Sequence, residues 1–258
     1  FLLAAIPTFL WLKERGRPRR LARPTQYLVL GVRKVRGTLS AVGDRRDLAW
    51  LLGSVFFAMA GIYIVITFTF IYGAQVIQWN ERTRVVMFVV VQLTAAGGAL
   101  GFGAIQDRVG AKRTYQGTLL LWLLAILLIY ATPSIARWCS SWSGMVVEPQ
   151  YVFVVVGTVA GACLGGTQSA GRTLVGLFAP KKKAAEFFGF WGLSAKLAAI
   201  TGILGLGLLQ AFVGLHTAIL LCMVLFALAV VIAIPVNEAR GRAAAAESQT
   251  RDALRSAG

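Results

Sequence analysis

The stretch "GFGAIQDRVGAKR", residues 101–113, decides how this chain is organised, because it places charged side chains between two long uncharged runs. The charges are Asp107, Arg108, Lys112 and Arg113. The run before them, 85–101, has 17 uncharged residues, and the run after them, 114–136, has 23. A charged turn between apolar runs of this length is typical of a loop that connects two membrane-spanning helices.

Composition supports a membrane protein. The chain has 258 residues, of which 57% are hydrophobic and 14% charged, and its mean hydropathy is +0.72. A soluble domain of this size needs more polar surface. About 20 apolar residues in helical form cross a bilayer core of about 30 Å, and helices satisfy every backbone group within their own segment. The runs are apolar on all faces, which excludes the alternating strands of a transmembrane barrel.

The sequence predicts an all-α protein with six membrane-spanning helices. The expected spans are residues 48–72, 85–106, 114–133, 150–178, 187–209 and 214–236. The opening piece, "FLLAAIPTFLWL" (1–12), is too short to cross and has no basic region before it, so it is interpreted as the end of a preceding span. The chain is therefore expected to be the C-terminal part of a longer protein.

Residues 13–47 are predicted to form a basic cytoplasmic linker with an amphipathic helix. The apolar positions of this helix recur at spacings of three and four residues, and they are Leu28, Val32, Val35, Leu39 and Val42. Two interpretations remain open. The helix either lies on the inner membrane face, with its cations near anionic headgroups, or packs as a soluble helix on the ends of the bundle. The last segment, 237–258, is predicted to be a disordered cytoplasmic tail.

The net charge of +16 is distributed unevenly, and this distribution predicts the orientation. With six spans, 21 Lys and Arg residues fall on one side of the membrane and three on the other. Basic loops remain cytoplasmic, so the first full span is expected to run from inside to outside, in a bacterial inner membrane. Membrane lipids are expected partners. Nucleic acid is not, because the basic loops flank spans and lack interleaved aromatic residues.

Two cations lie within predicted spans, where a charge costs about 2.5–3.5 kcal/mol on insertion scales. Lys196 is the only charge in 187–237 and lies about 15 Å deep at 1.5 Å per residue. It is interpreted as a cavity-lining cation or as one half of a structural ion pair. Arg172 either faces the same cavity or extends to the inner surface. Gln168 lies one turn away from Arg172 on the same helix face.

These three residues are candidate contacts for a substrate, and no Asp or Glu lies in the middle of a predicted span to pair with them. Weaker candidates, chosen only for their polarity in mid-span, are Tyr63, Thr67 and Gln92. Any acidic partner, and any carboxylate that carries a coupling proton, is therefore expected from outside these spans.

The sequence contains no recognisable set of catalytic or metal-binding residues. The three cysteines, Cys139, Cys163 and Cys222, and the single histidine, His216, show no metal-ligand spacing, and no known protease motif occurs. We expect no catalytic residue, no metal and no cofactor, and a surface or packing role for His216.

Small residues predict close helix packing. Gly157, Gly161 and Gly165 repeat every four residues, as do Gly97 and Gly101. Such faces allow helix backbones to approach one another in lipid. The pattern is compatible with static packing and with helices that slide during a transport cycle.

The opening stretch resembles the loop signature of the major facilitator superfamily, G-x-L-x-D-R-x-G-x-K/R-R. The matching residues are Gly103, Ile105, Asp107, Arg108, Gly110, Lys112 and Arg113, with Ile105 in place of the usual leucine. In that family the loop joins the second and third helices of each six-helix half on the cytoplasmic side. The resemblance implies that its charged residues stabilise one conformation of the transporter.

A second stretch, residues 165–196, resembles the vacuole-effluxer-like branch of the same superfamily, whose yeast members export amino acids from the vacuole. The matching residues are Gly165, Gly166, Gln168, Arg172, Pro180, Glu186, Phe187, Phe188, Gly189 and Lys196. Gly171 replaces an expected serine, and Trp191 replaces an expected tyrosine.

The resemblance implies a fold and a function. The fold is the C-terminal six-helix bundle of a twelve-helix major facilitator transporter, preceded by the end of a span and the linker helix. The function is secondary-active or facilitative transport of a small solute by alternating access, with amino acids as the candidate substrates. The missing N-terminal six-helix half is an expected partner, because the substrate site of such folds lies between the two halves. The alternative is a membrane scaffold or sensor that uses the same fold without transport.

Overall fold

A computed structural model describes residues 6, 10, 46–180 and 183–257, with side chains up to residue 250. The chain divides into two compact units, Phe1–Leu39 and Ser40–Gly258, and the helices described below lie in the second. The predicted end of a preceding span and the predicted linker helix fall almost wholly outside the described residues.

Six of the described segments are long and apolar enough to cross a membrane, which confirms the predicted spans. They are α3 (Arg46–Tyr72), α4 (Glu81–Val109), α5 (Ala111–Ser143), α6 (Pro149–Phe178), α7 (Ala184–Val213), and the short helix α8 (Leu215–Ala218) with α9 (Leu220–Ala233). A π-helical turn, Gly73–Ile77, extends α3. Helix α5 continues ten residues past the predicted end at Pro133. Membrane helices tolerate an interior proline because neighbouring groups can satisfy the backbone carbonyl that it leaves unpaired.

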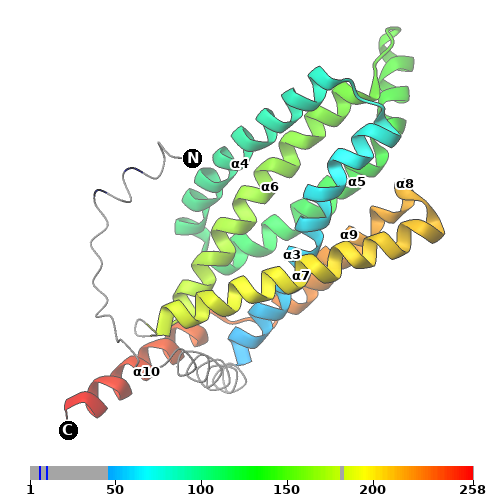
Figure 1. The fold of residues 1–258 in the computed structure, drawn as a ribbon. Coiled ribbons are helices and arrows are strands. Elements are labelled where there is room, and N and C mark those ends of the chain that lie inside the picture. The colour runs from blue at the N-terminus through cyan, green and yellow to red at the C-terminus, as the bar shows by residue number, and fades with distance from the viewer. Residues whose placement is uncertain (1–5, 7–9, 11–45, 181–182, 258) are drawn as a thin grey trace. The chain divides into compact units, whose positions relative to one another are not determined.

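The helices pack in two connected groups (Figure 1). Helix α6 contacts α4 and α5, and α3 contacts α7 and α9, while α5 and α9 join the groups. Helix α3 is the central element, since 61% of its most apolar segment is buried. The corresponding values are 11% for α4 and 17% for α7, so these two helices present long apolar faces that the described residues leave uncovered.

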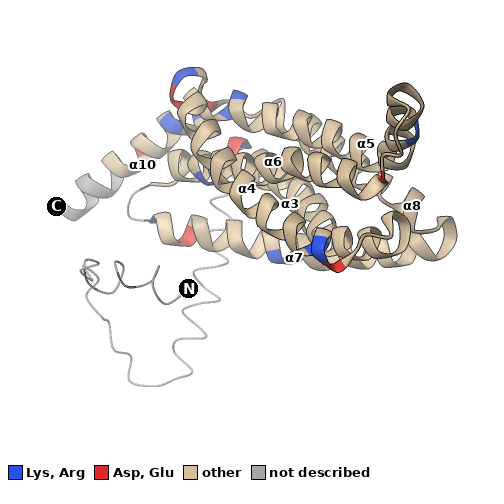
Figure 2. Cartoon of the chain, turned by 90° about the horizontal axis from the view of Figure 1, so that it is seen from above, with Lys and Arg blue, Asp and Glu red and all other residues tan. Residues whose placement is uncertain are grey.

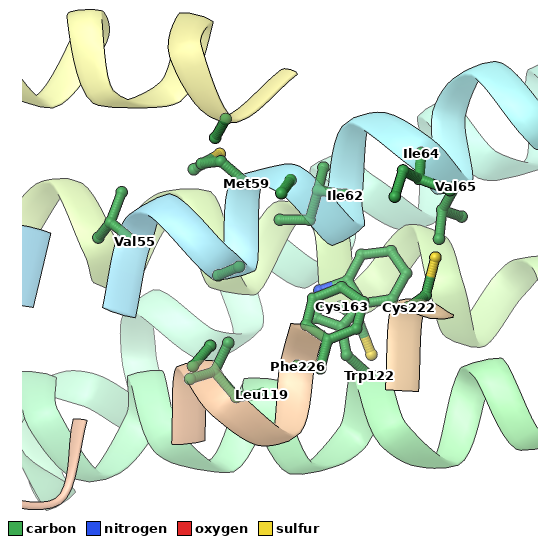
Figure 3. Packing of buried hydrophobic residues seen from close by; sticks show 14 of the residues in the cluster. Val55, Met59, Ile62, Ile64, Val65, Leu119, Trp122, Cys163, Cys222 and Phe226 are labelled. Carbon is green, nitrogen blue, oxygen red and sulfur yellow. The ribbon is translucent and has the colours of Figure 1, made fainter. Parts of the chain in front are cut away.

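The core forms where α3, α5, α6 and α9 meet (Figure 3). Trp122 stacks on Phe226 with 5.0 Å between ring centres and 6° between planes. The indole nitrogen of Trp122 donates a hydrogen bond of 3.1 Å to Thr167 Oγ1, so this buried ring has no unpaired polar atom. Cys163 and Cys222 are buried, and Cys139, Cys163 and Cys222 are free thiols.

The glycines of α6 allow close contact with α4, as predicted. A Cβ atom on Gly165 would lie 1.8 Å from the carbonyl oxygen of Ala95, and one on Gly161 would lie 2.1 Å from Thr94 Oγ1. Both values are far below any real van der Waals contact. The two backbones can therefore approach only because these positions lack side chains.

The structure does not test the prediction for Gly97 and Gly101 of α4, because both residues are exposed on the described bundle. A Cβ atom at either position would meet no atom within 4 Å, whereas one on Gly98 would lie 2.3 Å from the carbonyl oxygen of Ala162. Residues adjacent in a helix point about 100° apart, so the choice between neighbouring glycines depends on where α6 lies. The sequence spacing identifies a small-residue face, but it does not identify the helix that covers it.

The prediction of a disordered tail was wrong, because residues Glu238–Ala257 form helix α10. The Asn237 side chain accepts a hydrogen bond of 3.0 Å from the Arg240 backbone N–H, and the alanine-rich sequence favours helix. Gly241 and Ala245 are buried against the bundle, and a Cβ on Gly241 would collide with the ring of Phe178. Polar composition suggested disorder, but a narrow stripe of small residues is sufficient to attach this helix.

An ion pair also attaches α10 to the start of α3. Arg240 donates from Nε and Nη2 to the two carboxylate oxygens of Asp47, at 2.5 and 2.7 Å, and Asp47 also accepts from the Asn237 backbone N–H at 2.7 Å. The hydrogen bond and charge of Asp47 raise the pKa of the Arg240 guanidinium above its ordinary value.

Figure 2 shows that charged residues concentrate at helix ends, while the middles of the long helices are largely uncharged.

Candidate functional site

Lys196 on α7 lies next to an aromatic ring of α3. Its Nζ atom is 5.7 Å from the centre of the Tyr63 ring, a distance at which the ring face attracts a cation. Lys196 is exposed on the described bundle, and no acidic side chain among the described residues forms an ion pair with it. The described bundle therefore contains no acidic partner for a structural ion pair with Lys196.

Arg172 on α6 has a similar environment. Its guanidinium carbon is 5.2 Å from the centre of the Trp191 ring on α7, and the side chain is exposed. Within the described part of the chain, Arg172 has no acidic partner. Two helices thus each contribute a cation that rests on an aromatic ring of a neighbouring helix. Trp191 and Lys196 lie five residues apart, about 7.5 Å along α7.

Two buried polar atoms near Arg172 have no hydrogen-bond partner among the described residues. They are Oε1 of Gln168, one turn away on α6, and Nε1 of Trp191. A buried polar group without a partner costs about 1–3 kcal/mol, and such groups are uncommon in native proteins. The region around Arg172 therefore contains a cation without an acidic partner, and a donor and an acceptor without a hydrogen-bond partner, among the described residues.

The weaker sequence candidates separate in the structure. Tyr63 joins Lys196, and Gln92 of α4 lines a cavity of about 150 Å³ between α3, α4, α5 and α6. The walls of this cavity are mainly apolar, and they include Val65, Phe70, Met87, Trp122, Phe153 and Leu164. Thr67 is exposed and does not line the cavity, whereas Thr69 does. The polarity that selected Thr67 applies equally to Thr69, and only the rotation of α3 distinguishes them.

The charged motif that opened the sequence analysis forms a tight corner between two helices. Asp107 and Arg108 end α4, Lys112 and Arg113 begin α5, and Gly110 alone separates the helices. Gly110 has φ +95°, a conformation that L side chains rarely adopt. The glycine of the motif is therefore required by backbone geometry. Gly103, two turns earlier, has open space around it.

Contacts from this corner reach the C-terminal helix. The Lys112 backbone N–H donates a 3.0 Å hydrogen bond to Glu238 of α10, and its Nζ donates a 2.9 Å bond to the carbonyl of Ile234. Glu238 thereby caps the first turn of α5, where an acid is favourable. Asp107 is exposed, with no hydrogen bond or ion pair to another described residue, so its implied role in stabilising one conformation of the transporter stays a prediction. Sequence reasoning missed Glu238, because no spacing links it to Lys112.

His216 packs in an aromatic cluster at the opposite end of the bundle. Its Nδ1 lies 2.8 Å from Tyr72 Oη, and its ring stacks on Tyr130 with 4.4 Å between ring centres. These contacts attach α8 to α3 and α5, which agrees with the expected packing role.

Comparisons with known proteins agree with this architecture. Residues 1–246 match the family described as "Vacuole effluxer Atg22 like". A curated relative, the "Uncharacterized MFS-type transporter YxiO" of Bacillus subtilis (strain 168), is 23% identical over 214 residues, which cover 82% of this chain and 46% of the relative. The chain thus spans about half the length of that relative, and no solved structure matches it. From the family match and its six apolar helices, the chain belongs to the vacuole effluxer Atg22-like family of multi-pass membrane proteins.

Proposed function

We propose that this chain forms the C-terminal half of a transporter that moves a small carboxylate-bearing solute, with amino acids as the substrate class, by alternating access. The related MFS-type transporter and the length ratio support a two-half architecture. The uncovered faces of α4 and α7 support it as well, since a second bundle would bury them. The substrate would then bind between the halves, near the middle of the membrane.

The observation that carries the proposal is the pair of cations on α6 and α7. Arg172 and Lys196 rest on Trp191 and Tyr63, and neither has an acidic partner among the described residues. Cations in a span are costly unless a cavity hydrates them or an anion binds them. A solute carboxylate supplies the missing charge and forms strong, charge-assisted hydrogen bonds. A carboxylate that carries a coupling proton would come from outside the six spans, for example from the other half.

The proposal is tested by Arg172→Met in the full-length protein reconstituted into liposomes. Methionine keeps an unbranched chain but removes the charge. We expect uptake of an equimolar mixture of radiolabelled amino acids to fall by about tenfold or more, because a hydrogen bond to a charged group contributes about 1.5–3 kcal/mol. Arg137→Met is the matched control, since Arg137 is exposed near the far end of α5 and, among the described residues, bonds only to Ser134.

Two results would contradict the proposal. Uptake by the Arg172→Met protein equal to that of the unaltered protein would remove Arg172 from the site. Failure of the unaltered protein to take up or bind any amino acid in the mixture would favour a membrane scaffold or sensor.

The charge distribution also supports an orientation, with the connection after α6 and helix α10 on the cytoplasmic side. Single cysteines are introduced as Lys183→Cys and Val146→Cys in a Cys139→Ser background, since both positions are exposed at opposite ends of α6. In intact cells, a membrane-impermeant maleimide should label the cysteine at position 146 and not the one at 183. The reverse pattern would overturn the orientation.

A further inference from the structure

The indole ring of Trp191 carries a hydrogen-bond donor that the described bundle leaves unused. Its Nε1 atom is buried and has no acceptor among the described residues. An indole nitrogen only donates, so the missing partner must be an acceptor. Buried donors in native proteins are nearly always paired with protein, water or a ligand. The Nε1–H of Trp191 therefore needs an acceptor other than the described protein atoms, which is a water molecule or a ligand.

Arg172 contributes further donors at the same place. Its guanidinium carbon lies 5.2 Å from the centre of the Trp191 ring, and no acid within the described ranges pairs with it. A guanidinium also has no acceptor atom, so these neighbouring side chains cannot satisfy each other by a hydrogen bond. Both side chains donate and neither accepts, so the chemistry of the pair suits an anionic group with two acceptor oxygens.

Gln168 provides an atom of the opposite kind. Its Oε1 is buried and lacks a donor in the described part of the chain, and it lies one turn from Arg172 on the same face of α6. A solute that carries an N–H group near its carboxylate would satisfy this acceptor as well. The three side chains therefore define the chemistry of a ligand rather than its charge alone.

We propose that Trp191 determines specificity by donating its Nε1–H to the solute carboxylate that Arg172 binds. This inference rests on the proposed function, and it adds the selection of carboxylates over neutral carboxamides. A carboxamide offers one oxygen, but its NH₂ group would face the donors of Arg172 or Trp191. Mismatched donors lose a hydrogen bond and leave a buried group unpaired, which discriminates strongly between close analogues.

The experiment compares Trp191→Phe and Trp191→Tyr in the full-length protein. Phenylalanine keeps an aromatic face for Arg172 but has no donor, whereas tyrosine keeps both. The apparent Kd is measured from thermal stabilisation by an equimolar mixture of the twenty amino acids and by a mixture of their carboxamides. Trp138→Phe is the matched control, because Trp138 is 66% exposed near the far end of α5.

We expect Trp191→Phe to raise the apparent Kd for the amino acids by about tenfold or more and to reduce the preference over carboxamides. Trp191→Tyr should recover part of both, and Trp138→Phe should change neither. A role in packing alone would lower the melting temperature without changing that preference.

Three outcomes overturn the inference. If Trp191→Phe binds amino acids like the unaltered protein while Arg172→Met does not, the inference fails and the proposed function stands. If the unaltered protein binds no amino acid, both fail together. If the phenylalanine variant does not fold, the tyrosine variant carries the test, and equal affinity of that variant for acids and carboxamides overturns the inference.

Discussion

Gly165→Ala is expected to destabilise the bundle by about 3 kcal/mol, the upper end of the usual range for overpacking, and Gly165→Leu to prevent stable folding. The added Cβ would lie 1.8 Å from the Ala95 carbonyl oxygen and 2.7 Å from the Ala99 nitrogen. Both atoms belong to the backbone of α4, so no side-chain rotation can relieve the collision. The two helices would have to separate along their contact. Thermal unfolding in detergent, followed by size-exclusion chromatography, measures the effect.

Gly97→Ala is the matched control for this prediction. The substitution is chemically identical and lies on the other helix of the same pair, but a Cβ at position 97 meets no atom within 4 Å. Alanine also favours helix by about 1 kcal/mol over glycine, so this variant should be as stable as the unaltered protein or slightly more stable. Equal melting temperatures for the Gly165→Ala and Gly97→Ala proteins would contradict the contact between α4 and α6.

Lys196→Met is expected to abolish transport by the full-length protein while the protein remains folded. The lysine carries the only charge in 187–237, and its Nζ rests on the Tyr63 ring without an acidic partner among the described residues. Removing an unpaired cation from an apolar span leaves no charge behind, so stability should be unchanged or higher. Uptake and thermal stabilisation by the amino acid mixture should both be lost.

A structural ion pair with an acid of the other half predicts a different result. The variant would then leave that acid unpaired and lose about 3–5 kcal/mol of stability. A lowered melting temperature with an intact response to amino acids would refute the substrate-contact role. Lys183→Met controls for the removal of a positive charge, because Lys183 is exposed where α7 begins.

Much of the fold was predictable because the bilayer imposes a length. An uncharged run of 20 or more residues is long enough to cross the membrane as one helix, so each run predicts one span. The charged corner at Gly110 marks the boundary between α4 and α5. Boundaries were less predictable where no charge marks them. Helix α5 passes through Pro133, and α10 forms from a sequence whose polarity suggested a disordered tail.

The candidate site was predictable in its cations but not in their partners. Lys196 and Arg172 are visible in the sequence because a charge in an apolar span is rare. The aromatic partners of these cations cannot be identified from the sequence. Tyr63 and Trp191 are ordinary residues for a span, and each lies on a different helix from the cation that it contacts. The unpaired atoms of Gln168 and Trp191 emerge only when the neighbouring helices are in place.

The sequence by itself determined the class of protein, the six spans and the two cations, since hydrophobic length and charge are local properties that need no knowledge of neighbours. Only the tertiary structure decided that Gly98 rather than Gly97 contacts α6, that Glu238 caps α5, and that Arg172 rests on Trp191. Each of these depends on the rotation of a helix about its axis. That rotation is set by packing between helices, because lipid solvates apolar side chains on every face equally well.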